Sequence, residues 1–161
     1  ISLGYPARSD EISILDQQQR MADEAAKNGR LINHPLDEIG QVISSDELVE
    51  VQQHVKRIYV DRLVMEYIVD LVTATRDHQE VYLGASPRGS SALVRSVQAR
   101  AALGGREYAI PDDVKALAGP TLAHRLIVSP AARIRNVDTR QIVAEILDTV
   151  PVPGAKVAGR L

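Results

Sequence analysis

The sequence predicts an all-α fold, a bundle of five or six helices with one short strand at its front. Apolar residues recur every three or four positions along most of the chain, which is the spacing of one helix face. Residues typical of helix starts and ends, such as Ser, Asp, Pro and Gly, bound these segments. The 161 residues, of which 45% are hydrophobic, suffice for one globular domain, alone or with an appendage.

The strand is expected in residues 1–6, ISLGYP. Its alternating side chains, which precede a Gly-Tyr-Pro break, are Ile1, Leu3 and Tyr5. Because one strand is not stable without neighbours, we expect it to finish a sheet whose other strands lie outside this chain. We therefore expect the chain to be a piece of a longer protein. Further short extended segments are expected at 108–110 and 126–128.

Two amphipathic helices follow the strand. The first begins at Ser9 and is expected to end at Asn28–Gly29. Residues 28–44 lack sustained periodicity, so we expect them to cross the surface. The second helix begins with the capping-box pair Ser44 and Glu47. Its apolar stripe consists of Leu48, Val51, Val55 and Ile58.

The third helix is apolar on almost every side. Asp61 can cap its N-terminus. Its apolar residues are Leu63, Val64, Met65, Tyr67, Ile68, Val69, Leu71 and Val72. Because little polar face remains, we expect this helix at the centre of the bundle.

The fourth helix has clear start and stop residues. Ser86 is expected to be the N-cap and to accept a hydrogen bond from a free amide, while Pro87 fills the first helical position. Gly104–Gly105 are expected to end the helix. Its apolar face consists of Leu93, Val97 and Ala101.

Two further helices complete the bundle. Pro111 begins one of them, and Asp112 and Asp113 give it the ordinary acidic first turn. We expect Gly119–Pro120 to break or kink this helix. The last helix ends before Pro151, and its apolar residues are Ile142, Val143, Ile146, Leu147 and Val150.

The composition excludes several classes of function. The formal net charge is -2, so no overall field favours nucleic acid or an anionic membrane. Phe and Trp are absent, which disfavours base stacking in a single-strand binder. The lack of cysteine removes thiolate metal sites and disulfides. No apolar run has the length of a membrane span and no signal peptide is visible, so we expect a cytoplasmic protein without nucleic-acid partners.

The sequence also lacks the common catalytic motifs. No Gly-Lys dipeptide occurs, so the chain has no P-loop, and no HExxH pair for zinc is present. The four histidines lie in separate segments without ligand spacing: His34, His54, His78 and His124. We therefore predict neither a catalytic residue nor a metal site in this chain.

Arg88 is the unusual residue of the fourth helix. It falls in the first turn, where the helix dipole disfavours a cation, and no acid lies between Gly84 and Arg95. Free amides and a guanidinium at a helix N-terminus suit a phosphate. Arg95 lies seven residues on, on nearly the same face. Spacing alone leaves two readings open, an anion-binding residue and a solvated surface arginine.

Five ordered blocks resemble the C-terminal half of the MoxR family of AAA+ ATPases. They are SLGYP at 2–6, YIVDLVTATR at 67–76, GASPRGSSAL at 84–93, PDDVKALA at 111–118 and AHRLIV at 123–128. The resemblance implies that residues 1–6 are the end of the AAA+ core strand and the hinge, and that residues 7–161 are the C-terminal helical lid. Arg88 matches the family's sensor-2 arginine, which reaches the γ-phosphate of ATP.

The resemblance implies further ATP-binding residues. Tyr5 and Pro6, at the hinge, are expected near the adenine edge, and Tyr67 and Ile68 are expected to line it from the lid side. Core packing explains these four residues equally well. Arg76 fits the Thr-Arg pair of the family, and it could equally be a structural ion-pair residue.

The implied function is a nucleotide-sensing lid that couples ATP binding and hydrolysis to remodelling or activation of partner proteins. ATP and magnesium belong to the full-length protein, and neither is expected to bind tightly to this chain, which is expected to be non-catalytic. Expected partners are the AAA+ core domain of its own chain, neighbouring subunits of a hexamer, and an unknown client. The alternative is a stand-alone helical protein-interaction module without a nucleotide role.

Overall fold

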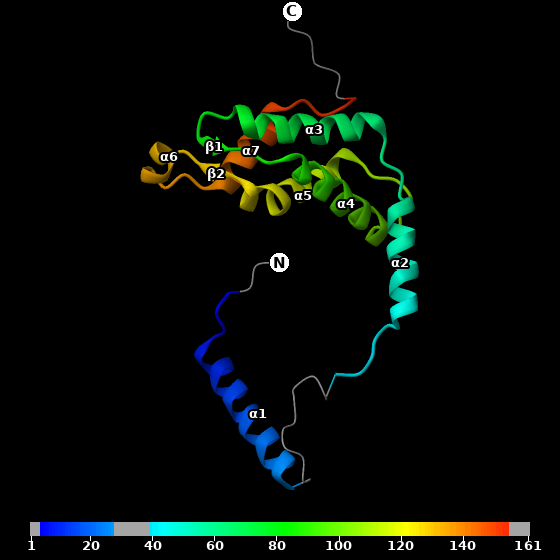
Figure 1. The fold of residues 1–161 in the computed structure, drawn as a ribbon, viewed down its shortest axis with the longest axis vertical. Helices are drawn as coiled ribbons and strands as arrows, with labels where there is room; N and C mark the ends of the chain where they lie inside the picture. Colours follow the sequence, from blue (N-terminus) through cyan, green and yellow to red (C-terminus); the bar gives the residue numbers. More distant parts are fainter. Residues whose placement is uncertain (1–3, 28–38, 155–161) are drawn as a thin grey trace, which may run out of the picture. The chain divides into compact units, whose positions relative to one another are not determined.

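The computed structural model describes residues 4–27 and 39–154, and the chain divides into two units, Ile1–Leu48 and Val49–Leu161. The described residues form seven α-helices, a 3₁₀ helix and a two-stranded sheet (Figure 1). The predicted all-α class is therefore confirmed. Within the described ranges, no helix combines the length and apolarity that a membrane crossing requires.

The first unit contains helix α1 (Arg8–Lys27). Its first turn carries acidic residues, and the Ala7 amide donates to the Asp10 carboxylate at 3.2 Å. Residues buried on this helix are Met21 and Ala25. The structure thus confirms a helix where the spacing predicted one.

The predicted front strand falls largely outside the described residues. Residues 1–3 are not described, and residues 4–6 form neither helix nor strand. The predicted helix stop at Asn28–Gly29 is likewise outside the described ranges. The strand, the hinge and their boundary with the lid therefore stay predictions.

Helix α2 (Ser45–Arg57) begins with the predicted capping box. The Ser44 amide donates to the Glu47 carboxylate at 2.8 Å, and the Glu47 amide donates to the Ser44 hydroxyl at 3.2 Å. These reciprocal bonds satisfy two of the amides that have no partner inside a helix. Of the predicted stripe, Ile58 is buried, whereas Leu48 and Val51 are exposed.

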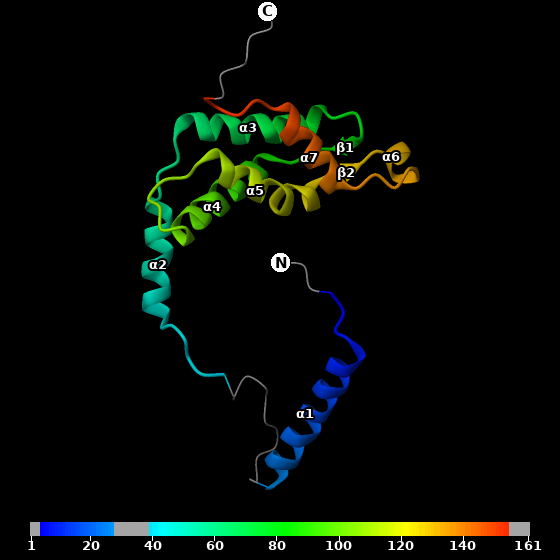
Figure 2. The ribbon, with the colours of Figure 1, turned by 180° about the vertical axis from the view of Figure 1, so that it is seen from behind.

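The second unit is built around four helices that pack against one another. Its elements after α2 are α3 (Arg62–Asp77), β1 (Val81–Leu83), α4 (Pro87–Leu103), α5 (Pro111–Leu122), η2 (Ala123–Arg125), β2 (Ile127–Val128), α6 (Pro130–Ile134) and α7 (Thr139–Thr149). Helix α4 packs on α3 and α5, and α7 packs on α3 and α5 (Figures 1 and 2). The short helix α6 is the one that the sequence did not predict.

The apolar faces of these helices form one core. The predicted α4 residues Leu93, Val97 and Ala101 are fully buried. The other helices add Leu71, Val72, Val114, Ala118, Leu122, Ile142, Val143 and Ile146. Burying one such side chain stabilises the folded state by about 1.5–3 kcal/mol, so this core is the main support of the unit.

Helix α3 does not lie at the centre of the bundle, and this prediction is wrong. Asp61 caps its N-terminus by accepting a bond from the Leu63 amide at 2.8 Å, as expected. However, Leu63, Met65 and Val69 remain exposed, and only the opposite face is buried. Neighbouring helices cover one side of α3 alone, so its apolar residues exceed what the unit can bury.

Two other expectations changed in detail. Gly119–Pro120 does not end α5, because the helix continues to Leu122 with Pro120 inside it, and η2 follows. The extended segment expected at 126–128 is strand β2, which pairs antiparallel with β1. The segment expected at 108–110 contributes one isolated bridge, between Tyr108 and Tyr59.

Candidate functional site

Arg88 occupies the second position of α4, as the sequence predicts, and its side chain is exposed. Among the described residues, none forms a hydrogen bond or ion pair with it. No acidic residue occurs from residue 81 to residue 106. An exposed cation thus stands at a helix N-terminus without a carboxylate nearby in the sequence, a setting that attracts an anion.

Ser86 is the N-cap residue of α4, but its side chain makes no capping bond. The Gly89 amide donates instead to the backbone carbonyl of Ser86 at 2.7 Å. The expected side-chain cap is therefore wrong, because a backbone turn already uses one of the amides that the hydroxyl could have bound. Pro87 fills the first helical position as predicted.

The chain just before α4 is held by the end of α3. The buried Ala85 amide donates to the Thr75 hydroxyl at 3.0 Å. Nε of Arg76 donates to the Ala85 carbonyl at 2.9 Å. Both backbone polar groups of Ala85 are therefore bonded to two adjacent side chains, which we name the Thr75–Arg76 clamp.

Gly84 makes the clamp compact. A Cβ atom at this position would lie 2.7 Å from both Cα and Cγ of Arg76 and 2.8 Å from its amide nitrogen. These distances are shorter than any ordinary van der Waals contact. Glycine is therefore required here because the two backbone segments approach so closely.

A second arginine lies beside the first turn of α4. The antiparallel register pairs Leu83 with Ile127, so the residues after β1 lie next to those before β2. Arg125 accordingly passes close to Gly89, and its Nη1 donates to the Thr121 carbonyl at 3.0 Å. No acid occurs from residue 114 to residue 137, so this end of the unit is locally basic.

Apart from Arg76 in the clamp, the other predicted site residues belong neither to α4 nor to the turn before it. Tyr67 and Ile68 are core residues of α3, exposed by 1% and 0%. The Tyr67 hydroxyl finds no partner among the described residues. Burial, and then the nearby charge of Asp112, raise the pKa of this hydroxyl. Tyr5 belongs to the other unit and is fully exposed.

Sequence reasoning missed the importance of Asp113. Its carboxylate is buried and accepts both arms of the Arg106 guanidinium, at 2.7 Å and 2.8 Å. Arg100 lies 3.2 Å away, and the Ile110 amide donates at 3.1 Å. Burial raises the pKa of Asp113, but the Arg106 and Ile110 hydrogen bonds and the two guanidinium charges outweigh it, so the pKa is lowered. Ile110 is the N-cap residue of α5 and has no side-chain oxygen, so the Asp113 carboxylate accepts the hydrogen bond from the Ile110 amide.

Comparison with known proteins gives consistent matches. An AAA lid domain model matches residues 73–146. The uncharacterized protein YeaC of Bacillus subtilis is 36% identical over 160 residues, which cover 99% of this chain and 46% of YeaC. Chaperone MoxR1 of Mycobacterium tuberculosis is 26% identical over 95% of this chain and 39% of its own length. The chain is homologous to the MoxR proteins.

The structural comparison agrees with the MoxR homology. A crystal structure from Cytophaga hutchinsonii, of a protein described as a candidate ATPase, superposes with a TM-score of 0.72. It is 25% identical, and the match covers 94% of this chain and 45% of that one. Protein MoxR of Paracoccus denitrificans is 43% identical over 76 residues. The chain spans about half the length of YeaC and of the Cytophaga protein.

The AAA lid match covers the residues that surround Arg88. It includes the Thr75–Arg76 clamp, helix α4, Asp113 and Arg125. Tyr67 and Ile68 precede the matched range, as does the first unit. The part of the chain that the lid model describes therefore runs from the last turns of α3 through the sheet, α4 and α5 into α7.

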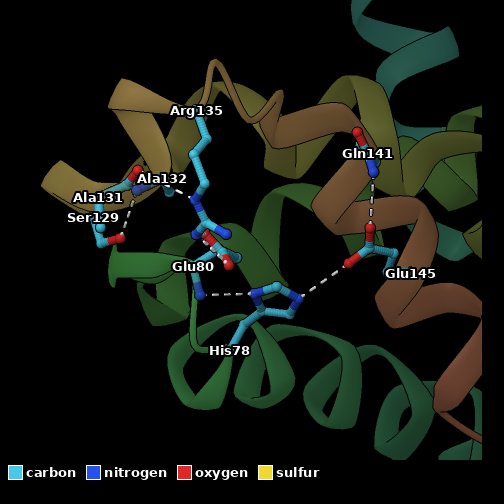
Figure 3. A network of polar contacts seen from close by, with 8 residues as sticks. All are labelled: His78, Glu80, Ser129, Ala131, Ala132, Arg135, Gln141 and Glu145. Atoms are coloured by element: carbon cyan, nitrogen blue, oxygen red, sulfur yellow. Dashed lines mark hydrogen bonds and ion pairs between the residues drawn. The ribbon is translucent and has the colours of Figure 1, made fainter.

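A polar network links the elements at the sheet end of the second unit (Figure 3). The Glu80 amide donates to Nδ1 of His78 at 3.2 Å, which leaves Nε2 as the protonated nitrogen facing Glu145 at 3.5 Å. The guanidinium of Arg135 binds the Glu80 carboxylate at 2.7 Å. Residues near β1 are thus tied to α6 and α7.

The Glu80–Arg135 pair should contribute little to stability. Arg135 is 61% exposed, so Arg135→Ala should lower the free energy of unfolding by at most about 1 kcal/mol, and less at high salt. Urea denaturation at low and high salt measures this change. Arg133→Ala, which removes an exposed arginine from α6 two residues before Arg135, is the control. A loss above about 2 kcal/mol would contradict the prediction.

Proposed function

We propose that this chain is the nucleotide-sensing lid of a MoxR-type AAA+ ATPase. In the full-length protein, the core domain of the same chain holds ATP and magnesium, and Arg88 reaches the γ-phosphate from the lid. The complete protein assembles as a hexamer, and it couples ATP binding and hydrolysis to remodelling or activation of a client protein. Tyr5 and Pro6 at the hinge border the adenine, whereas the burial of Tyr67 and Ile68 favours core packing over the adenine contact that the resemblance implies for them.

The position of Arg88 carries this proposal. Its side chain is exposed in the first turn of α4, and no carboxylate among the described residues neutralises it. A guanidinium presents a planar fork that suits phosphate oxygens, and helix amides nearby favour negative charge. An arginine on a separate domain can stabilise charge during phosphoryl transfer and can register whether the γ-phosphate is present.

The AAA lid match supports the same assignment, as does the fact that this chain spans only about half the length of YeaC and of the Cytophaga protein. The lid model covers Arg88 and the elements that hold it. The sequence has no Gly-Lys dipeptide, and therefore no P-loop of its own. We infer that the phosphate-binding loop and the catalytic acids belong to the core domain of the full-length protein, and that the lid reaches the phosphates through Arg88.

Arg88→Ala tests the proposal in the full-length protein. Single-turnover ATP hydrolysis should fall by roughly 10-fold or more, because one charge-assisted hydrogen bond of about 1.5–3 kcal/mol is lost at the transition state. Arg88→Lys should recover part of the rate, since it keeps the charge but not the fork. Arg95→Ala, an exposed arginine of the same helix, is the matched control and should retain the rate.

Thermal melts of the same variants separate a functional role from a structural one. Arg88 is exposed and forms no hydrogen bond or ion pair with the described residues, so Arg88→Ala should leave the melting temperature nearly unchanged. Removing a cation from the first turn relieves a small dipole penalty, which adds a few tenths of a kcal/mol at most, so roughly no change is expected. Full activity together with a clear loss of stability would make Arg88 a structural residue.

One observation favours the alternative, a protein-interaction module without a nucleotide role. An open apolar groove of about 390 Å³ lies at the sheet end of the unit. Its lining residues are Tyr82, Ile127, Val128, Pro130, Arg133 and Ile134. The Arg88→Ala experiment distinguishes the two functions. If the unit is an interaction module without a nucleotide role, the substitution should leave the rate of ATP hydrolysis unchanged.

A further inference from the structure

We propose that the Thr75–Arg76 clamp is a positioning device for Arg88, so that the end of α3 sets where this arginine points. The inference rests on the proposed function, because it concerns how Arg88 reaches a phosphate. It gives Arg76 a role different from phosphate contact, namely fixing the backbone from which Arg88 projects.

The clamp holds Ala85 through both of the peptide groups that flank it. Thr75 accepts from the Ala85 amide at 3.0 Å, and Arg76 donates to the Ala85 carbonyl at 2.9 Å. Ala85 is 1% exposed, so its amide and carbonyl would have no water to bond to if the clamp were lost, and leaving them unpaired costs free energy. Both backbone polar groups of Ala85 are therefore satisfied only when the end of α3 lies against this turn.

Thr75 is itself held in one orientation. Its hydroxyl has one hydrogen, and it donates that hydrogen to the Val72 carbonyl at 2.6 Å. The hydroxyl oxygen is then available as an acceptor for the Ala85 amide. Thr75 is fully buried, so water does not compete for its hydroxyl group.

Little freedom remains between the clamp and Arg88. Gly84 packs directly on the backbone of Arg76, so the two segments cannot approach further. Pro87 has a fixed φ angle, and the Gly89 amide closes the turn on the Ser86 carbonyl at 2.7 Å. The two residues between Ala85 and Arg88 therefore transmit the orientation of α3 to the arginine.

The environment of Arg76 agrees with this role. Its Nε is already bonded to the Ala85 carbonyl, and no carboxylate pairs with it among the described residues. The interpretation of Arg76 as an ion-pair residue is therefore not supported within those residues. Contact with the backbone of the turn gives the arginine in the last turn of α3 a structural role.

A double-mutant cycle in the full-length protein tests the inference. Thr75→Val keeps the side-chain shape and removes the hydroxyl, and it should lower kcat about 5-fold with little change in KM, because a misplaced arginine stabilises the transition state poorly. In an Arg88→Ala background, Thr75→Val should change kcat less than about 2-fold, since coupled residues are non-additive. Thr75→Ser restores the hydroxyl and should recover the rate.

Hydrogen exchange supplies a readout that does not depend on activity. In Thr75→Val, amide exchange in the peptide covering residues 84–89 should become faster, because the Ala85 amide loses its partner. Exchange in the middle of α4 should stay unchanged. Arg76→Leu changes an exposed side chain and keeps the buried Thr75 hydroxyl, so it serves as the second variant if Thr75→Val does not fold. It should lower kcat in the same way.

The outcomes are distinguishable. An unchanged rate in Arg88→Ala would overturn the proposed function and this inference together. A reduced rate in Arg88→Ala with additive effects of Thr75→Val or Arg76→Leu would overturn the positioning role alone. The positioning role would also be overturned if the clamp variants lowered kcat only in proportion to their loss of global stability, and by the same factor with Arg88 present or replaced by alanine.

Discussion

Asp113→Ala will destabilise the four-helix unit by about 2–3 kcal/mol, because it removes a buried carboxylate that accepts charge-assisted hydrogen bonds. The Asp113 side chain is 3% exposed, and it neutralises Arg106 and Arg100 while accepting from the Ile110 amide. Alanine leaves that amide without its acceptor and the two guanidinium groups without a shared anion. Urea denaturation followed by circular dichroism measures the loss.

Asp112→Ala is the matched control, because it removes the same charge from the same turn. Asp112 is exposed, so its loss should cost about 0.3–1 kcal/mol, the usual effect of an acid near a helix N-terminus. Equal losses for the two aspartates would show that the helix dipole, and not the buried network, accounts for the effect. Asp113→Asn should lie between them, since the amide oxygen can still accept from Ile110.

The same network should make stability depend on pH. The pKa of Asp113 is lowered in the folded state, so its stabilisation is fully present above the unfolded value of about 4. It is lost as the pH falls through the folded-state pKa. Wild-type stability should therefore drop more steeply below about pH 4 than that of Asp113→Asn.

Gly84→Ala will destabilise the unit by about 1–3 kcal/mol, the usual cost of overpacking, and the larger value is expected because the obstacle is backbone. The new methyl group would lie 2.7 Å from Cα of Arg76. To relieve this contact, the turn must move away from α3, which also lengthens the two hydrogen bonds of Ala85. Thermal unfolding of the purified variant measures the loss.

Gly104→Ala is the control for Gly84→Ala. Gly104 ends α4 with a φ of -83°, and the nearest atoms to its added Cβ lie 3.4 Å or further away. The substitution should therefore change the free energy of unfolding by less than about 0.5 kcal/mol. If both glycine variants behaved alike, the close approach of Gly84 to Arg76 would not be the cause.

The helices could be predicted from the sequence because residues only a few positions apart determine where a helix forms and which of its faces is apolar. Leu93, Val97 and Ala101 share one face of α4 by spacing alone, and all three are buried. Asp61 and the Ser44–Glu47 pair also cap their helices as expected, since capping depends on residues two or three positions apart. Arg88 could be placed in its turn for the same reason.

Features that depend on tertiary contacts could not be predicted from the sequence. Asp113 has the sequence pattern of an ordinary acidic first turn, and only the approach of Arg106 makes it a buried anion. Strand β1 spans three residues and exists because β2 pairs with it, which no local pattern reports. The exposed face of α3 was missed because apolarity does not tell which side a neighbour covers.

The clamp has a consequence for the order of folding. Its partners are nine and ten residues apart in the chain, whereas the Glu80–Arg135 pair joins residues 55 apart. Closing a short loop costs less chain entropy than closing a long one, and local contacts form sooner. We therefore expect Arg88 to acquire its place early, as the α3–α4 hairpin docks, and the sheet and α6 to close afterwards around an arginine whose direction is already set.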